Sequence, residues 1–284
     1  MHKINDWFII CDMETIIQKQ KSGSIKPAEL PDWMVSHGLS VITTEECSHL
    51  MGVPTTQVPQ RLIRLRDKGK IVSAARGLWI VVSPQFREMG APEPIQYIHR
   101  LMSFYHCEYC IGWLSAAALS GVSHQAPQVF QIATDKILRD RTIGRSRLQF
   151  FHRSYVGRIS RKRVVTSDGA AISCTPAVTM LMVSTDLKIS AGINNAATIV
   201  SELAQEYNDY MDDLMDNLSY FPDSAVCRLG WILDHVAGES GLEELADYCS
   251  KASSLSLLAP GGSRNGKIDK RWNIIENREV EADI

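Results

Sequence analysis

The chain has 284 residues, of which 45% are hydrophobic and 22% charged, and its formal net charge is −2. That length allows two domains with sizeable cores, and the composition argues against both a disordered chain and a membrane protein. Seven cysteines, an odd number, in a sequence without a recognisable export signal argue against a disulfide framework and predict a cytoplasmic protein.

The first interpretable elements are two helices joined by a tight turn. Thr43 can cap a helix whose first turn holds Glu45 and Glu46, where the helix dipole favours carboxylates. Gly52 ends this helix and begins a short turn. A second helix follows, for which Thr55 or Thr56 can serve as the cap, and it carries a proline in its first turn.

The second helix is amphipathic and basic. Its residues Val58, Leu62 and Leu65 are spaced i, i+4, i+7, which predicts a buried stripe. Gly69 stops the helix, and the segments 70–72 and 78–82 are expected to form strands joined by a turn that contains glycine. Between residues 54 and 80 there are six basic side chains against a single acid. Helix, tight turn, basic helix and β-hairpin in this order predict a winged helix-turn-helix.

Such a helix can lie in the major groove of DNA, where arginine bonds guanine and glutamine bonds adenine. The adjoining hairpin would bring its cations to phosphates or to the minor groove. The side chains that we expect to contact DNA are Thr56, Gln57, Gln60, Arg61, Arg64 and Lys68 on the helix, and Lys70 and Arg76 in the hairpin. An amphipathic helix with a basic, solvated outer face is the alternative interpretation.

The rest of the chain is predicted to be a larger mixed domain, so that the whole protein is α+β. Prolines and glycine over residues 83–94 indicate a linker. We therefore assign residues 1–88 to a DNA-binding domain with an N-terminal helical extension, and residues 89–284 to a second domain. The expected helices cover residues 95–105, 113–119, a segment that begins at Thr175, 194–210 and 224–235; the expected strands cover residues 129–134, 147–151 and 271–275.

A second basic region lies between residues 136 and 163, with ten basic side chains against Asp140 alone. Unpaired guanidinium groups are too costly to bury, so the loop that carries Arg139, Arg141, Arg145 and Arg147 is expected to face water, the acidic stretch around Asp212, or a polyanion. We take it as a possible second basic surface that extends the DNA-contacting face or touches an RNA or nucleotide. Its residues are Lys136, Arg139, Arg141, Arg145 and Arg147.

Several phrases of the sequence, in this order, resemble the AbiEi antitoxins of type IV toxin–antitoxin (abortive infection) systems, which act in phage defence. They are GVPTTQVPQRLIRLRDKGKI, GLWIVV, MGAPEP, LSAAALSG, HQAPQVFQIATD, TPAVTMLM, INNAATIVSEL and RWNIIENREVEADI. The resemblance covers the chain from about residue 35 to its C-terminus and leaves the segment before about residue 28 without a counterpart.

The resemblance implies an N-terminal winged helix-turn-helix that represses the antitoxin's own operon at inverted repeats in double-stranded DNA. It also implies a C-terminal domain that counteracts a nucleotidyltransferase-like toxin, AbiEii, without requiring a stable complex with it. The family requires no metal and no small-molecule cofactor, so we expect no cofactor, no catalytic residue and no membrane contact.

Two motifs resemble ligand sites. Residues 261–267 have the spacing of a phosphate-binding P-loop up to Lys267, but Ile268 replaces the hydroxyl that binds magnesium. A solvated loop before the last strand is the preferred interpretation. Cys107 and Cys110 have the C-x-x-C spacing of a metal or thiol site, yet the other cysteines are isolated in the sequence, which favours buried free thiols.

Two further features resemble catalytic groups. His124 has hydroxyl neighbours but no acid close in the sequence, and we interpret it as structural or facing nucleic acid. Carboxylates between Glu206 and Asp216 could serve a metal-dependent nuclease, although a solvated helix face is the better interpretation.

Three hypotheses follow from these patterns. The chain is a DNA-binding antitoxin and autorepressor, or an enzyme that processes nucleic acid, or a winged-helix transcription regulator without a toxin partner. The absence of a convincing cluster of carboxylates, histidines or cysteines weighs against the enzyme. The sequence does not separate the antitoxin from the regulator, whereas a neighbouring gene for a nucleotidyltransferase-like protein would.

Overall fold

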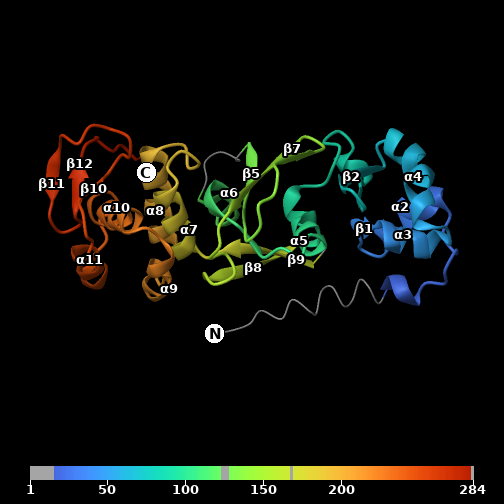
Figure 1. The fold of residues 1–284 in the computed structure, drawn as a ribbon, viewed down its shortest axis with the longest axis horizontal. Helices are drawn as coiled ribbons and strands as arrows, with labels where there is room; N and C mark the ends of the chain where they lie inside the picture. Colours follow the sequence, from blue (N-terminus) through green and yellow to red (C-terminus); the bar gives the residue numbers. More distant parts are fainter. Residues whose placement is uncertain (1–15, 123–127, 167–168, 283–284) are drawn as a thin grey trace.

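The structure is a computed structural model that describes residues 16–122, 128–166 and 169–282. The molecule is elongated, and its parts follow one another along the long axis (Figure 1). A small helical unit with a three-stranded sheet lies at one end, a six-stranded sheet lies in the middle, and a group of helices with a second three-stranded sheet lies at the other end. The predicted α+β fold class is therefore confirmed.

The N-terminal unit has the element order expected of a winged helix-turn-helix. Its sheet has the strand order β1-β3-β2, and both pairings are antiparallel. The elements are α2 (Leu30–Ser36), β1 (Val41–Thr43), α3 (Thr44–Met51), the short 3-10 helix η2 (Thr55–Gln57), α4 (Val58–Asp67), β2 (Ile71–Ala75) and β3 (Leu78–Val81). The two predicted helices and the hairpin are all present.

One detail of the prediction was wrong. Neither Thr55 nor Thr56 caps α4, because both lie in η2, and the residue at the N-cap is Gln57, whose side chain makes no capping hydrogen bond. Pro59 occupies the first turn of α4 as expected, since a proline there removes an N–H that has no intrahelical partner.

The middle of the molecule is a mixed sheet with the strand order β6-β7-β5-β4-β9-β8. The strands are β4 (Tyr109–Ile111), β5 (Val129–Thr134), β6 (Arg141–Ile143), β7 (Ser146–His152), β8 (Arg161–Thr166) and β9 (Gly169–Cys174). Strands β5 and β7 pair in parallel, as do β4 and β9, whereas the other neighbours are antiparallel. The strands predicted over residues 129–134 and 147–151 are confirmed as β5 and β7.

Helices fill the space between the middle sheet and the C-terminal end (Figure 1). The helices after the wing are α5 (Pro94–Phe104), α6 (Trp113–Leu119), α7 (Pro176–Thr185), α8 (Ile193–Glu206), α9 (Met211–Asn217), α10 (Asp223–His235) and α11 (Glu243–Ser250). Helix α7 is the central one: every residue from Ala177 to Ser184 is buried, and it packs against α6, α8, α9 and α10. The helix predicted over residues 194–210 ends earlier, at Glu206, and α9 is a separate helix.

The C-terminal sheet consists of β10 (Ser256–Leu257), β11 (Lys267–Asp269) and β12 (Ile274–Glu276), in the order β10-β12-β11. The strand predicted over residues 271–275 starts only at Ile274. The preceding Trp272 lies in a turn, fully buried, against Gly230 of α10, where a Cβ atom would collide with its ring. No helix in the described parts of the chain is long and apolar enough to cross a membrane.

Two hydrophobic clusters form the core. One is confined to the N-terminal unit and contains Leu50, Val58, Leu62 and Leu65. The other extends through the middle sheet and the helices, and it also includes buried residues of the N-terminal hairpin, among them Ala74, Leu78 and Ile80. The hairpin thus belongs to both parts, and the predicted boundary at residue 88 stays a prediction.

Candidate nucleic-acid interface

The turn between α3 and α4 is fixed from both sides. Helix α3 begins with a capping box, in which the Glu46 N–H donates to Thr43 Oγ1 (3.1 Å) and the Thr43 N–H donates to Glu46 Oε2 (2.7 Å). The helix ends at Gly52, which has φ 63°. A Cβ atom on Gly52 would lie 2.7 Å from the Cα of Gly23, so only glycine lets the two segments approach this closely.

The described part of the N-terminal extension therefore has a structural role that the sequence left open. The N–H groups of Gly23 and Ile25 donate to the carbonyls of His49 and Leu50 (both 3.1 Å) at the end of α3. The side chains of Ile17 and Ile25 are buried in the N-terminal core. This segment satisfies carbonyls that a helix end leaves without partners, and it braces the turn that positions α4.

Helix α4 separates its apolar and polar faces as predicted. Val58, Leu62 and Leu65 are buried. The predicted contact residues of this segment are all exposed to solvent: Thr56, Gln57, Gln60, Arg61, Arg64 and Lys68. Within the described part of the chain Arg61, Arg64 and Lys68 form no ion pair, whereas Arg66 lies 3.3 Å from Asp67. Three free cations on one outward face are therefore available to a polyanion.

The β2–β3 hairpin, which we call the wing, is held at its tip. The Thr44 N–H donates to the carbonyl of Gly77 (2.8 Å), and Trp79 Nε1 donates to Thr44 Oγ1 (3.1 Å). Gly77 has φ 96° and faces the ring of Phe104 in α5. The wing turn thus packs between α3 and the second part of the chain. The side chain of Arg76 is exposed and that of Lys70 is partly exposed.

The second basic region is only partly a free surface. The expectation that all its arginines face solvent was wrong for Arg141, which is half-buried in β6. Its Nη1 donates to the carbonyl of Ala74 in the wing (2.8 Å), and its guanidinium stacks 4.9 Å from the ring centre of Tyr105. The guanidinium can be buried because it gains a carbonyl and an aromatic ring as partners.

The other four side chains assigned to the second basic surface differ in their environments. Lys136 is exposed, but its Nζ donates to the carbonyl of Tyr105 (3.1 Å) at the end of α5. Arg139 and Arg145 are exposed, and Arg147 is exposed with Nη2 3.9 Å from Asp140. No described ion pair joins these arginines to α9, so the acidic helix is not their partner.

The β6–β7 turn is seated on the segment that was predicted to be a linker. Gly144 has φ 59°, and a Cβ atom there would lie 2.7 Å from the N of Ala91. The Arg145 N–H donates to the carbonyl of Met89 (2.8 Å). These contacts fix the second basic region beside the wing, and in Figure 1 the β7 end of the sheet points toward β2.

A partly buried ion pair also joins the two parts of the chain. Arg100 of α5 lies 3.0 Å from Glu46 of α3, and the two side chains are 12% and 16% exposed. Glu46 is the same residue that closes the capping box. The pair therefore helps to hold the capped end of α3 against α5.

The segment with P-loop spacing lies in a strand–loop–strand setting. It connects β10 to β11, and its residues are exposed. The Asn277 side chain donates to the carbonyls of Ala259 (2.9 Å) and Ser263 (3.0 Å) and so closes the loop. A P-loop needs a helix directly after the glycines, and a strand occupies that position here.

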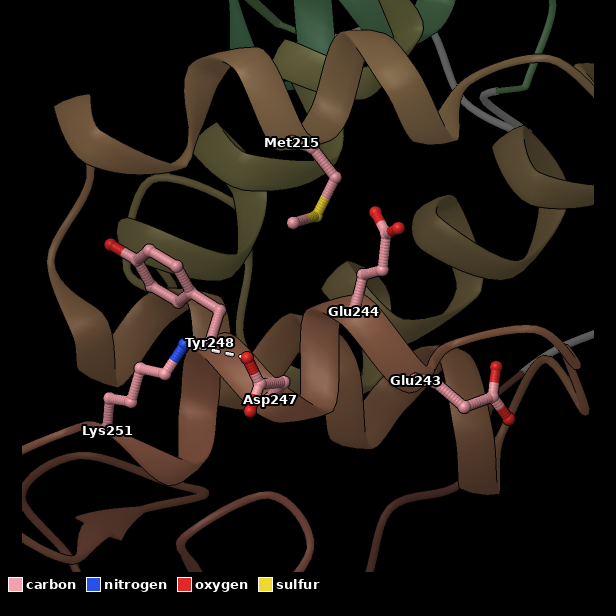
Figure 2. Close-up of a pocket in the computed structure, with 6 residues that line it drawn as sticks. All are labelled: Met215, Glu243, Glu244, Asp247, Tyr248 and Lys251. Carbon is pink, nitrogen blue, oxygen red and sulfur yellow. Dashed lines mark hydrogen bonds and ion pairs between the residues drawn. The ribbon is translucent and has the colours of Figure 1, made fainter.

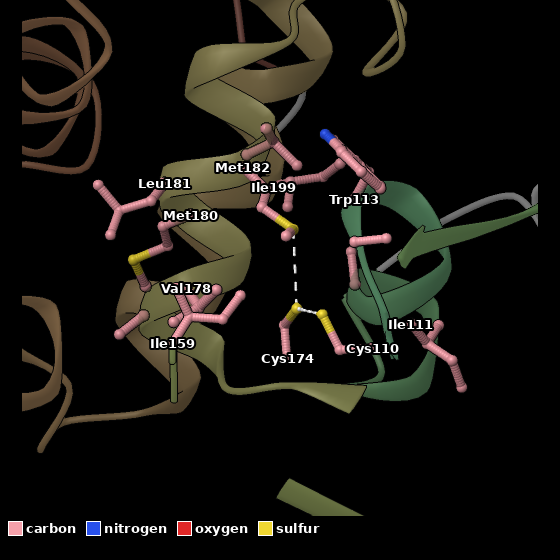
Figure 3. Close-up of a cluster of buried hydrophobic side chains, with 14 of the residues drawn as sticks. Cys110, Ile111, Trp113, Ile159, Cys174, Val178, Met180, Leu181, Met182 and Ile199 are labelled. Atoms are coloured by element: carbon pink, nitrogen blue, oxygen red, sulfur yellow. Dashed lines mark hydrogen bonds between the residues drawn. The ribbon is translucent and has the colours of Figure 1, made fainter. Parts of the chain in front are cut away.

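The six cysteines in the described residues are buried free thiols, as predicted. The C-x-x-C pair does not converge: Cys107 Sγ lies 3.0 Å from Asp135, and burial, with that hydrogen bond, raises the pKa of Cys107 to about 11. Cys110 instead lies 2.6 Å from Cys174 Sγ on the adjacent strand (Figure 3), and burial raises the pKa of Cys174 well above its usual value. The sequence did not indicate this pair, because the two thiols are far apart along the chain.

Three acidic side chains of α11 lie together at the opposite end of the molecule from α4. A shallow cavity of about 500 Å³ is lined by Met215 of α9 and by Glu243, Glu244, Asp247, Tyr248 and Lys251 of α11 and its end (Figure 2). Lys251 Nζ lies 2.6 Å from Asp247 Oδ2. No described histidine or cysteine lines this cavity. His124, the other candidate from the sequence, lies outside the described residues.

One group of side chains in the described residues has a spacing compatible with a cation. The ligand atoms of His235, Asp269 and Glu276 lie within 4.8 Å of one another. Each already has a partner, since His235 Nε2 lies 2.7 Å from Asp269 Oδ2 and Trp231 Nε1 donates to Glu276 (3.0 Å). Burial raises the pKa of Asp269, but hydrogen bonds from His235 and two backbone N–H groups lower it further, so it lies below its usual value. These contacts attach the C-terminal sheet to α10.

Comparison with known proteins identifies the middle of the chain. Residues 110–235 match the family model described as the AbiEi antitoxin C-terminal domain. The crystal structure of the RV2827C protein from Mycobacterium tuberculosis shares the fold, with a TM-score of 0.65 over 90% of this chain and 94% of that one, at 14% sequence identity. No curated protein sequence matches the chain.

The matched segment covers the middle sheet from β4 onward and helices α6 to α10. AbiEi domains belong to the antitoxins of type IV toxin–antitoxin systems, a regulatory rather than an enzymatic kind of protein. The resemblance to the AbiEi antitoxins is therefore confirmed, and residues 110–235 of this chain form an AbiEi antitoxin C-terminal domain.

Proposed function

We propose that the chain is the antitoxin of a type IV toxin–antitoxin system and that it represses its own operon by binding double-stranded DNA at the promoter. The observation that carries the DNA-binding part is the outward face of α4 and its two flanking residues, where two glutamines are exposed and three cations form no ion pair with a described residue. The buried stripe of α4, together with the capped helix α3 and the glycine turn that precede it, turns this face outward, the arrangement that lets a helix enter the major groove.

We assign the two functions, DNA binding and antitoxin activity, to the two predicted domains. Residues 1–88 bind DNA, and residues 89–284 counteract an AbiEii-like nucleotidyltransferase toxin without the need for a stable complex. The exposed arginines of the β6–β7 hairpin lie beside the wing and extend the basic surface. In this arrangement α4 reads base edges, while the wing and the hairpin neutralise phosphates.

A salt series of gel shifts tests the DNA-binding part. With the DNA upstream of its own gene, log affinity is expected to fall with log salt by about 0.9 for each phosphate neutralised. If roughly six cations engage, affinity falls by about three orders of magnitude between 50 and 200 mM salt. Equal affinity for the promoter and for a random duplex of the same length would refute operator recognition.

A growth assay tests the antitoxin part. The toxin reading frame adjacent to the gene is induced in a bacterial host with and without this chain, and co-expression is expected to restore growth. Size-exclusion chromatography of the two purified proteins then shows whether rescue requires a complex. Absence of an adjacent nucleotidyltransferase-like frame, together with normal promoter binding, would favour the alternative of a transcription regulator without a toxin.

A further inference from the structure

One side chain on the outward face of α4 is neither charged nor polar. Ile63 is 42% exposed, and within the described residues it is the exposed large hydrophobic side chain of this helix. Its neighbours on the helix surface are Gln60 at i−3 and Asp67 at i+4, and Arg64 is the next residue along the helix. An isoleucine is also a poorer helix former than the alanine or lysine that a solvated face favours. Neither the buried stripe nor helix propensity explains its place.

The chemistry of the major groove supplies an explanation. An A·T pair offers the adenine N7 and N6 groups, which glutamine can bond in a bidentate manner, and the thymine 5-methyl group, which attracts apolar side chains. Gln60 and Ile63 stand one helical turn apart on the same face and so present the two complementary groups together. Arg64 can bond a neighbouring guanine or a phosphate.

We infer that Ile63 is a specificity-determining residue that contacts a thymine methyl group in the operator, next to the base bonded by Gln60. This inference rests on the proposed function, because it needs α4 to lie in the major groove. It goes further by naming the base that this face selects. Thymine is recognised by its methyl group and not by charge, so the contact contributes to sequence choice without adding to the salt dependence.

Uracil substitution tests the inference on the full chain. The operator is located by footprinting, and each thymine in it is replaced in turn by uracil, which removes the methyl group and keeps the base pairing. At one thymine in each half-site, affinity measured by fluorescence anisotropy is expected to fall by about fourfold, the factor that corresponds to removing one methyl group from an apolar environment.

Variants then assign the effect to the side chain. Ile63→Ser is expected to bind the thymine and uracil operators equally, and Ile63→Val to keep the discrimination. Ile268→Ser is the matched control, because Ile268 is 49% exposed on β11 at the other end of the molecule, and it should discriminate like the unmodified protein (Figure 1). Both positions are exposed, so the melting temperatures should stay unchanged.

The outcomes are distinguishable. An unmodified protein that shows no preference for its promoter over random DNA overturns the proposed function and this inference together. A protein that recognises the promoter but tolerates uracil at every thymine overturns the inference alone. The same holds if Ile63→Ser retains the full discrimination between thymine and uracil.

Discussion

The two basic regions are both rich in cations in the sequence, but they differ in the structure. On α4 the cations Arg61, Arg64 and Lys68 have no ionic partner among the described residues, and the helix is held by its apolar side. In the second region Arg141 and Lys136 donate to backbone carbonyls of the wing and of the end of α5, whereas Arg139, Arg145 and Arg147 are exposed. Charge density along the chain therefore does not measure the charge available to a ligand.

The difference arises from the secondary structure that carries each region. A helix with a buried stripe directs its polar residues outward as a group, because the periodicity of 3.6 residues keeps them on one face. A strand alternates its side chains, so that neighbours in the sequence point to opposite sides. Arg141 accordingly points toward the wing, whereas Thr142, the next residue in β6, is exposed.

The largest expected effect comes from the helix. Replacing Arg61 and Arg64 together by alanine should weaken promoter binding by about 2–6 kcal/mol, since each base-contacting arginine contributes roughly 1–3 kcal/mol. Competition gel shifts against random DNA measure this weakening. Arg66→Ala is the control on the same helix, because Arg66 is paired with Asp67. If Arg66→Ala weakened binding as much as the double variant, the helix face that carries Arg61 and Arg64 would not be the one that contacts DNA.

The second prediction concerns stability. Arg141→Met removes the donor to the carbonyl of Ala74, a residue that is 4% exposed. A buried acceptor left without a partner costs about 1–3 kcal/mol, so the free energy of unfolding in urea should fall by that amount. Arg139→Met, at an exposed position, should change it by less than about 0.5 kcal/mol. Identical unfolding curves for the two variants would make Arg141 a surface residue like Arg139.

The third prediction concerns the exposed arginines in and just before the β6–β7 hairpin, as distinct from Arg141, which donates to the carbonyl of Ala74. Changing Arg139, Arg145 and Arg147 to glutamine should lower affinity for all DNA sequences alike. The slope of log affinity against log salt should decrease by about 0.9 for each phosphate that the variant no longer neutralises, or roughly 2.7 in total. A thermal melt checks that the fold is intact. An unchanged salt slope would show that these three arginines do not contact DNA and are only exposed to solvent.

The smallest effect is expected in the wing. Lys70→Ala combined with Arg76→Ala should reduce the salt slope by about 1.8 and leave the preference for the promoter over random DNA unchanged. The tip of the wing is fixed by α3 and α5, so these two residues contribute through their charge and not through a moving loop. If this variant lost its preference for the promoter, the wing and not α4 would be the element that reads the base sequence.

The N-terminal unit was predictable because its signals are local. A hydroxyl cap, a glycine at the helix end and the spacing of Val58, Leu62 and Leu65 each act within a few residues, and each predicted element was found. The N-cap predicted at Thr55 or Thr56 was wrong, because these residues form a 3-10 helix before α4. Local signals therefore predicted that the helix exists but not the residue at which it begins.

The interactions that join distant segments were not predictable. Arg100 pairs with Glu46, Arg141 with Ala74, and Cys110 with Cys174, and in each case the partners are separated by more than fifty residues. No periodicity or cap reports such a pairing. Short strands such as β4 and β6 were missed for a related reason, because three residues are too few to show an alternating pattern.

The shared core at the wing bears on how this protein can be divided. Ala74, Leu78 and Ile80 are at most 4% exposed and pack within the larger hydrophobic cluster. A fragment that ends at residue 88 would leave this apolar surface in water and remove the partner of Glu46 on α5. Such a fragment is expected to aggregate or to melt at a lower temperature than the full chain. A cut after α5 keeps Arg100 and much of the apolar cover of the wing, and is the better design for an isolated DNA-binding piece.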